Sequence, residues 1–280
     1  MARTFKAGSV EVGSGRPLAV IAGPCVLESL DQAVEIGTHA RDVCRGLGLS
    51  YIFKASFDKA NRSSIRSARG PGMETGLKWL SAVREQLGVP VTTDIHAPEQ
   101  AGPAARAVDA LQIPAFLCRQ TDLLLAAGTE AARHGRGVNV KKGQFMSPME
   151  MAGAVRKLGE AGCANVMLTE RGTFFGYGRL VNDMRSIPQM QALGVPVVFD
   201  ATHSCQLPGA QGTQTGGRPE FAAMLARCGI AAGADAIFLE IHDHPAQSKS
   251  DPATIQPLEA LEPLLKTCLA VRAAVQQIAK

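Results

Sequence analysis

The feature that most constrains this chain is a repeated alternation between short apolar runs and longer stretches with helical periodicity. Apolar residues recur at helical spacing in the longer stretches, and glycine often ends them. Such an alternation is typical of parallel strands joined by helical crossovers. The eight predicted strands are 18–23, 51–55, 89–94, 110–113, 137–140, 165–169, 195–200 and 234–240, and the predicted helices include 73–87, 121–134, 148–161, 219–232 and a last one within 257–280.

Eight such units in 280 residues predict a (β/α)8 TIM barrel, an α/β fold. A doubly wound protein with two domains would show a linker or a change of composition, and the sequence shows neither. We therefore expect one barrel domain over residues 1–280. Residues 1–16 precede the first strand, and the short runs 5–7 and 10–12 within them predict a β-hairpin that covers the bottom of the barrel.

Composition argues against several classes of partner. Subtracting 25 acidic from 29 basic residues gives a net charge of +4, and only 5% of residues are aromatic, so nucleic-acid binding is not expected. The apolar run 17–27 contains Gly23 and Pro24, and no stretch reaches the roughly 18 apolar residues of a spanning helix. We therefore expect neither a signal peptide nor a membrane segment. Seven cysteines without a CxxC pair predict reduced thiols and a cytoplasmic location.

A polar or ionisable side chain follows each of the eight predicted strands. Since the carboxyl ends of barrel strands meet at one mouth, these side chains are expected to converge there. Cations dominate the set although the whole chain carries only +4, and such crowding is unfavourable unless anions bind between them. Phosphate and carboxylate groups fit this pattern, whereas no Walker A or GxGxxG motif indicates a nucleotide. The predicted cationic rim comprises Lys54, Lys59, Arg62, Arg119, Lys141, Lys142 and Arg171.

Closure of the barrel predicts a second cluster. The strand 234–240 would lie between 195–200 and 18–23, which brings together Glu240 and the side chains that follow its two neighbours, Cys25 and His203. A thiolate, an imidazole and a carboxylate suit a divalent transition metal such as Zn²⁺ or Fe²⁺. The candidates for a fourth ligand are Asp251, His242, Asp243 and His244.

Seven segments at or beside the strand ends carry distinctive motifs. They read GPCVLES at 23–29, KASFDKANRSS at 54–64, TTDIH at 92–96, QIPAFLCRQTDLL at 112–124, NVKKGQF at 139–145, TERGTFFGYGRLV at 169–181 and FDATHS at 199–204. In this order, and over residues 19–265, the chain resembles the 3-deoxy-manno-octulosonate 8-phosphate synthase family. KANRSS together with NVKKGQF is the most specific part of the resemblance.

The resemblance implies an enzyme that condenses phosphoenolpyruvate with D-arabinose 5-phosphate and water. The expected products are phosphate and 3-deoxy-D-manno-octulosonate 8-phosphate, a precursor of lipopolysaccharide. It also implies a homotetramer of (β/α)8 barrels in which Arg119 reaches the site of a neighbouring subunit.

The resemblance further implies roles for individual residues. Phosphoenolpyruvate would be held by Lys54, Lys59, Lys141 and Arg171, and arabinose 5-phosphate by Asn61, Arg62 and Ser63. Ser56, Asp94, Gln112 and Arg119 complete the implied substrate-binding set, and the implied catalytic residues are Cys25, Lys59, His203 and Asp251.

The family divides into metal-dependent members with cysteine at the position of Cys25 and metal-independent members with asparagine there. Cysteine implies one divalent metal ion per subunit, such as Zn, Fe or Mn. The implied ligands are Cys25, His203, Glu240 and Asp251. One departure from the family is expected in segment 128–137, which would form a longer surface loop.

Two other functions compete with this interpretation. A sister synthase makes 3-deoxy-arabino-heptulosonate 7-phosphate from erythrose 4-phosphate, but its second-strand motif reads like KPRTS where this chain has KANRSS. A non-catalytic barrel that senses phosphosugars is the second alternative. A complete set of metal ligands has no evident use in such a sensor.

Overall fold

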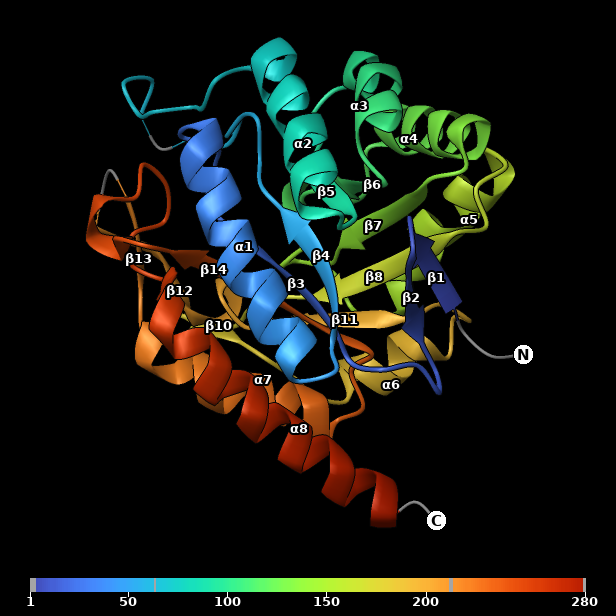
Figure 1. The fold of residues 1–280 in the computed structure, drawn as a ribbon. Coiled ribbons are helices and arrows are strands. Elements are labelled where there is room, and N and C mark those ends of the chain that lie inside the picture. The colour runs from blue at the N-terminus through green and yellow to red at the C-terminus, as the bar shows by residue number, and fades with distance from the viewer. Residues whose placement is uncertain (1–3, 63, 212–213, 279–280) are drawn as a thin grey trace.

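Parallel strands close into a barrel in the computed structural model, and helices surround it (Figure 1). The structure describes residues 4–62, 64–211 and 214–278. Within these residues the barrel has eight strands, and β14 pairs with both β11 and β3, which closes the sheet. In order around the barrel the strands are β3 (Ala19–Gly23), β4 (Ser50–Lys54), β5 (Val91–Asp94), β6 (Ala110–Ile113), β7 (Gly137–Lys141), β8 (Val166–Glu170), β11 (Val197–Asp200) and β14 (Ala236–His242).

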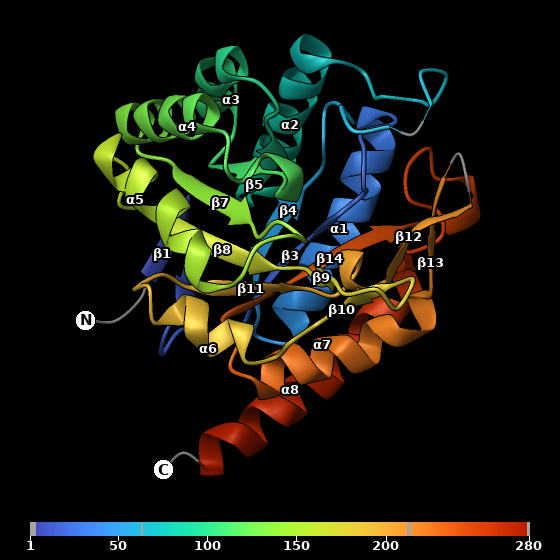
Figure 2. The same ribbon diagram turned by 180° about the vertical axis from the view of Figure 1, so that it is seen from behind.

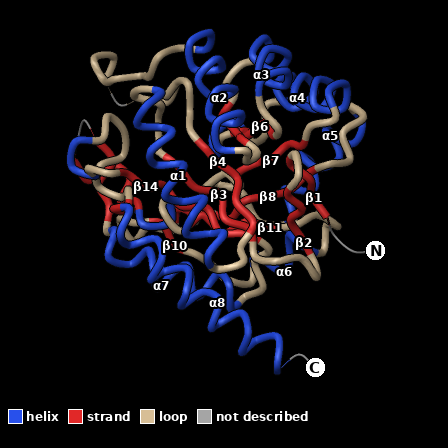
Figure 3. Tube along the Cα trace, viewed as in Figure 1, coloured by secondary structure: helices blue, strands red, loops and turns tan. Residues whose placement is uncertain are grey.

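Helices form the outer layer, as the blue coils around the red strands show in Figure 3. Helix α2 buries Leu77, Leu80 and Val83 on one face, and Gly88 in the left-handed conformation ends it, as helical spacing predicts. The helices are α1 (Leu30–Gly46), α2 (Met73–Leu87), α3 (Ala101–Ala107), α4 (Thr121–His134), α5 (Ala152–Glu160), α6 (Ser186–Gln191), α7 (Ala222–Ala231) and α8 (Leu261–Ile278). The predicted TIM barrel is therefore confirmed. Among the described residues, none of the helices is long and apolar enough to span a membrane.

The prediction of a long loop at 128–137 is wrong. Residues 128–134 form the second half of α4, and only Gly135 and Arg136 connect this helix to β7. Gly128 is buried where α4 packs on α5, and a Cβ there would lie 2.7 Å from the Cβ of Ala161. This glycine therefore allows close approach of two helices, and the predicted helix 121–134 is confirmed in place of the loop.

Short elements at the mouth of the barrel were not predicted. Two antiparallel hairpins follow strands β8 and β11, and both are visible in the rear view of Figure 2. Short 3-10 turns also precede several helices. One example is the turn that begins at Pro219, directly before α7. The additional strands are β9 (Thr173–Phe174), β10 (Leu180–Val181), β12 (Gln206–Gln211), β13 (Gln214–Gly217) and β15 (Gln256–Pro257), and the 3-10 turns are η1 (Pro98–Gln100), η2 (Ala115–Leu117), η3 (Met149–Met151), η4 (His203–Cys205), η5 (Pro219–Phe221), η6 (Pro245–Gln247) and η7 (Leu258–Ala260).

The predicted N-terminal hairpin is confirmed as β1 (Thr4–Ala7) paired with β2 (Val10–Gly13). The side chains of Phe5, Ala7 and Val12 are fully buried. They join one apolar cluster with side chains from the barrel strands. The hairpin therefore covers the amino-terminal ends of the strands, and the opposite end stays open for polar side chains.

Gly137→Ala is expected to destabilise the protein by about 1–3 kcal/mol, because a Cβ at this position would overlap the Phe5 ring and lie 2.8 Å from Nδ2 of Asn165. Chemical denaturation measures the free energy of unfolding. Gly159→Ala is the matched control: a methyl group on this helical glycine would meet no atom within 4 Å beyond the backbone of its own helix and its chain neighbours, so its change is expected to be neutral or slightly stabilising. Equal effects of the two changes would contradict the packing of Phe5 on β7.

Candidate active site

A cavity of about 660 Å³ opens at the carboxyl ends of the barrel strands. Its lining comes from loops that are far apart in sequence, which meet because the strands preceding them are neighbours in the barrel. The predicted site residues that line it are Lys54, Lys59, Asn61, Arg62, Asp94, Lys141, Arg171, His203 and Asp251.

Lys54 ends strand β4 and is 1% exposed. Its Nζ lies 3.2 Å from Oε1 of Glu240 and 3.3 Å from Oδ2 of Asp94. Burial by itself would lower the pKa of Lys54, but the charges of Asp94 and Glu240 raise it overall. Lys59 lies beyond, with Nζ 3.8 Å from the same Glu240 oxygen, and its pKa is also raised by acids despite burial. Both amines are therefore positively charged and held in place by acids.

Lys141 and Arg171 stand on the other side of the cavity. The Nζ of Lys141 lies 2.7 Å from Oδ2 of Asp200 and 4.0 Å from the centre of the Phe238 ring. Arg171 donates from one guanidinium nitrogen to Oε1 of Gln206 at 2.6 Å. Its other terminal nitrogen is buried without a hydrogen-bond partner among the described residues. Burial lowers the pKa of both Lys141 and Arg171, so a bound anion would stabilise their charged forms.

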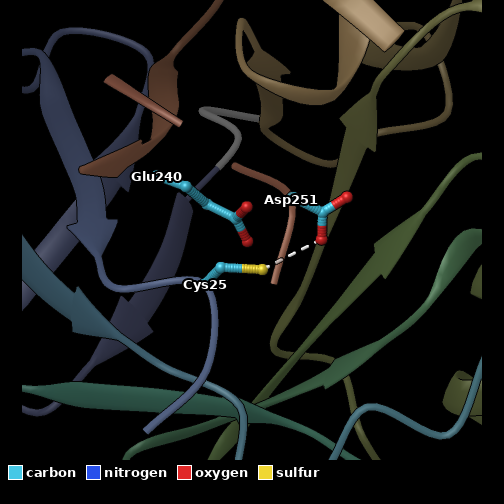
Figure 4. Close-up of side chains that lie close together, drawn as sticks. All are labelled: Cys25, Glu240 and Asp251. Atoms are coloured by element: carbon cyan, nitrogen blue, oxygen red, sulfur yellow. Dashed lines mark hydrogen bonds between the residues drawn. The ribbon is translucent and has the colours of Figure 1, made fainter. Parts of the chain in front are cut away.

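Cys25, Glu240 and Asp251 each offer an atom within 4.8 Å of the others, and Figure 4 shows the three side chains turned toward one another. Cys25 follows β3, whose last residue, Gly23, pairs with Glu240 of β14. Asp251 comes from the loop after β14 and accepts a hydrogen bond from the Cys25 thiol at 3.1 Å. Its φ of 51° lies in the left-handed region, a conformation that aspartate tolerates better than most residues. We call these three residues the thiol–acid cluster.

His203 adjoins the thiol–acid cluster through Glu240. It lies in the 3-10 turn after β11, with Nε2 3.7 Å from Oε2 of Glu240 and Nδ1 2.8 Å from Oδ2 of Asp200. The alternative ligand His242 faces elsewhere, since its Nε2 lies 3.5 Å from Glu28 and its Nδ1 accepts from the backbone of His244. The geometry thus favours Asp251 among the four candidates for a further ligand.

The side chains of this region fit a divalent cation. Oε2 of Glu240 is buried and has no hydrogen-bond donor among the described residues. Burial and the charge of Glu240 raise the pKa of the Cys25 thiol well above its usual value. Unpartnered buried acid atoms beside a thiol are unfavourable, and a cation between them would remove that cost. Sulfur, nitrogen and carboxylate oxygen are ligands that Zn²⁺ and Fe²⁺ accept.

A sequence profile of the DAHP synthetase I family matches residues 3–277. The chain belongs to this family. Within it, a Cyanothece protein is 54% identical over 266 residues, which cover 95% of this chain and 96% of that protein. A Citrifermentans bemidjiense protein is 50% identical over 277 residues, 99% of this chain and 100% of the relative. A Trichlorobacter lovleyi protein is 51% identical over 276 residues, with the same coverage.

All three relatives are named 2-dehydro-3-deoxyphosphooctonate aldolase, which is another name for the octulosonate 8-phosphate synthase. The resemblance drawn from the strand-end motifs is therefore confirmed. Within the DAHP synthetase I family, these names favour the octulosonate branch over the heptulosonate alternative.

Two members of the predicted cationic rim do not line the cavity. Lys142 is 1% exposed and does not line the cavity, since its Nζ lies 3.6 Å from Glu170 at the end of β8 and donates to the Thr173 hydroxyl of β9 at 2.9 Å. Its neighbour Lys141 faces inward because successive side chains of a strand point to opposite faces. Arg119 is exposed and lines a separate hollow of about 350 Å³ beside η3 and α5.

The remaining predicted residues lie at the edge of the site or beneath it. Ser56 and Gln112 are buried below the cavity, and both donate hydrogen bonds to Asp94. Arg62 is held at the cavity edge by the Ser250 hydroxyl at 3.0 Å. Ser63 lies outside the described residues.

Sequence reasoning missed two glutamines that line this cavity. Gln206 accepts from Arg171 and donates from Nε2 to Oδ1 of Asp251 at 3.1 Å, so it links the cationic side of the cavity to the thiol–acid cluster. Gln144 is 4% exposed, and its Oε1 has no partner among the described residues. Gln144 belongs to the motif NVKKGQF, which could have drawn attention to it, whereas nothing in the sequence marks Gln206.

Proposed function

We propose that this chain condenses phosphoenolpyruvate with D-arabinose 5-phosphate and water to form 3-deoxy-D-manno-octulosonate 8-phosphate and phosphate. One observation carries the proposal: a single cavity brings the cations Lys54, Lys59, Lys141 and Arg171 beside Asp251 of the thiol–acid cluster. Two phosphorylated anions need such a set of cations to approach each other closely. The names of the relatives support the same reaction.

Phosphoenolpyruvate is assigned to the inner part of the cavity. Lys54, Lys141 and Arg171 are buried, and acids or Gln206 fix their orientation. Donors that are already oriented stabilise charge on a ligand without reorganisation, and in a water-poor site each is worth more than on the surface. These side chains would hold the phosphate and carboxylate groups and leave C3 of the enol facing the aldehyde.

Arabinose 5-phosphate is assigned to the outer part. Asn61 and Arg62 line the cavity there, and Ser63 of the same motif is included in this assignment. Arg119 is proposed to come from a neighbouring subunit of a homotetramer. Its exposed position outside the cavity of its own chain supports this, as does the exposure of the nearby apolar side chains Phe145 and Met149.

In the proposed reaction, C3 of phosphoenolpyruvate forms a bond to the aldehyde carbon and water adds at C2. Phosphate then leaves as the bond between C2 and the bridging oxygen breaks. Asp200 fixes the ring of His203 through Nδ1, which leaves Nε2 facing Glu240, where it would hold the metal ion. Asp251 lines the cavity beside it and is the side chain assigned to carry a proton. Lys59 places a positive charge near the phosphate that departs.

Cys25, His203, Glu240 and Asp251 would hold one divalent metal ion per subunit. When bound, such an ion would supply Lewis acidity for the aldehyde oxygen or for the water. We also propose that residues 1–280 form one domain and that the protein works in the cytoplasm. The barrel that extends from β3 to β14 supports the first, and seven free cysteines support the second.

Turnover of two aldehydes by the purified protein tests the proposed function. Arabinose 5-phosphate with phosphoenolpyruvate is expected to release phosphate with a kcat/KM at least about a hundredfold higher than erythrose 4-phosphate. A preference for erythrose 4-phosphate would establish the heptulosonate alternative. Binding of the sugar phosphates without release of phosphate would establish the second alternative, a non-catalytic barrel that senses phosphosugars.

A further inference from the structure

Five buried side chains form a continuous hydrogen-bonded ladder inside the barrel, directly beneath the cavity. Thr169 donates its hydroxyl to Oδ1 of Asn139 at 2.8 Å, and Nδ2 of Asn139 donates to Oε1 of Gln112 at 2.9 Å. Nε2 of Gln112 then donates to Oδ1 of Asp94 at 2.6 Å, and the Ser56 hydroxyl donates to the other oxygen of Asp94. None of the five is more than 6% exposed, so water does not compete for these bonds.

Strand register places the members of the ladder. Asp94 of β5 pairs directly with Gln112 of β6, and Gln112 pairs directly with Asn139 of β7. Thr169 of β8 pairs with Lys141, two residues beyond Asn139 on the same face of β7. The ladder therefore crosses the interior from β8 to β5 and requires no unusual backbone.

Each bond of the ladder fixes the direction of the next. An ionised Asp94 only accepts, so Gln112 must turn its NH₂ toward it and its carbonyl toward Asn139. Asn139 must then present its own NH₂ to Gln112, which leaves its carbonyl for the Thr169 hydroxyl. Asp94 thus sets the direction of both amides, and the Thr169 hydroxyl supplies the donor that holds the last carbonyl in place.

Asp94 connects the ladder to the cavity through Lys54. Its Oδ2 lies 3.3 Å from Nζ of Lys54, which lines the cavity. We propose that Thr169 and Asn139 are positioning residues, which hold Gln112 and Asp94 so that the Lys54 ammonium points at the bound anion. Neither residue lines the cavity, so both act through Lys54. The inference rests on the proposed function in assigning phosphoenolpyruvate to Lys54.

Thr169→Val tests the ladder, because it keeps the shape of the side chain and removes only the end donor. The carbonyl of Asn139 is then buried without a donor, so Asn139 is held less firmly and in turn holds Gln112 and Asp94 less firmly. We expect the KM for phosphoenolpyruvate to rise about tenfold, with the KM for arabinose 5-phosphate changed less than about twofold. Thr169→Ser keeps the hydroxyl and is expected to restore the wild-type KM.

Thr93→Val is the matched control. Thr93 is fully buried next to Asp94, but its hydroxyl has no hydrogen-bond partner in the described part of the chain. Its replacement is expected to leave the KM for phosphoenolpyruvate unchanged. If the role of Thr169 were purely structural, Thr169→Val would lower the melting temperature but would not raise the KM for phosphoenolpyruvate selectively.

Asn139→Asp gives a stronger version of the test. A carboxylate still accepts from Thr169 but cannot donate to Gln112, so the Gln112 amide lies between two carboxylates and must present its oxygen to one of them. The expected rise in KM for phosphoenolpyruvate is larger than for Thr169→Val, about a hundredfold. If Asn139→Asp does not fold, Thr169→Val still tests whether the ladder positions Lys54.

Calorimetric binding of phosphoenolpyruvate and of inorganic phosphate separates the two possible failures. Wild-type protein that binds neither anion would overturn the proposed function. Wild-type protein that binds them, with Thr169→Val binding phosphoenolpyruvate as tightly as Thr93→Val does, would overturn the ladder as a positioning device. A selective loss in Thr169→Val, reversed in Thr169→Ser, supports it.

Discussion

Replacing Lys54 with methionine is expected to lower kcat/KM by about a thousandfold or more, because a buried cation aimed at a developing or bound negative charge contributes several kcal/mol in a water-poor site. The same change removes the shared partner of Asp94 and Glu240, whose oxygens lie 3.3 and 3.2 Å from the Lys54 ammonium. Breaking a buried pair on one side typically costs about 3–5 kcal/mol of unfolding free energy. Steady-state kinetics and urea denaturation measure the two effects.

Lys142→Met is the matched control for this prediction. Lys142 is as deeply buried as Lys54 and also faces a buried glutamate, Glu170 at 3.6 Å, but it does not line the cavity. We expect a comparable loss of stability with a loss of kcat/KM below about tenfold. If Lys54→Met kept kcat/KM within about tenfold of the wild type, the assignment of phosphoenolpyruvate to the inner cavity would be wrong.

Most of the fold was predictable because strands and helices leave strong periodic patterns. The helices at 73–87 and 121–134 and the strand at 110–113 match their predicted ranges, since each has a clear apolar period and a defined stop. The hairpins β9–β10 and β12–β13 were missed because their strands are short and show no regular apolar alternation. Their formation depends on contacts at the barrel mouth that no local pattern records.

The location of the candidate site could be predicted from the sequence, but many of its individual side-chain contacts could not. The rule that barrel chemistry gathers at strand ends brought Lys54, Lys141 and Asp251 to one cavity. This rule does not say which of the adjacent residues Lys141 and Lys142 faces the cavity. The structure decides this, because β7 runs to Lys141 and successive side chains point to opposite faces. The role of Gln206 depends on where a hairpin folds back, and only the three-dimensional structure reveals that.

Removal of divalent metal by a chelator is expected to lower the activity of the wild-type protein at least about a hundredfold, and added Zn²⁺, Fe²⁺ or Mn²⁺ is expected to restore it. Metal analysis should find about one ion per chain before chelation. Because burial and Glu240 raise the pKa of the Cys25 thiol, that thiol is protonated at neutral pH until a cation binds. Metal binding must then release this proton, so the affinity should rise about tenfold per pH unit below the pKa of the thiol.

Cys25→Asn is the decisive variant for the thiol–acid cluster. An asparagine amide carries two N–H donors, one for Asp251, which now accepts from the thiol, and one for the Glu240 oxygen that has no donor among the described residues. The site would thereby be satisfied without a cation. We expect this variant to bind metal weakly and to keep a reduced activity that chelation does not change.

Cys268→Ala provides the control for this comparison, since Cys268 is fully buried in α8, away from the cavity, and its loss should leave metal content and chelator sensitivity as in the wild type. Full activity of the wild-type protein after complete removal of metal would show that Cys25 is not a ligand. Chelator-sensitive activity in Cys25→Asn would show that His203, Glu240 and Asp251 hold the ion without the thiol. Either result would leave the assignment of the anions to the cationic cavity unchanged. It would revise only the role of the thiol–acid cluster in binding a metal ion.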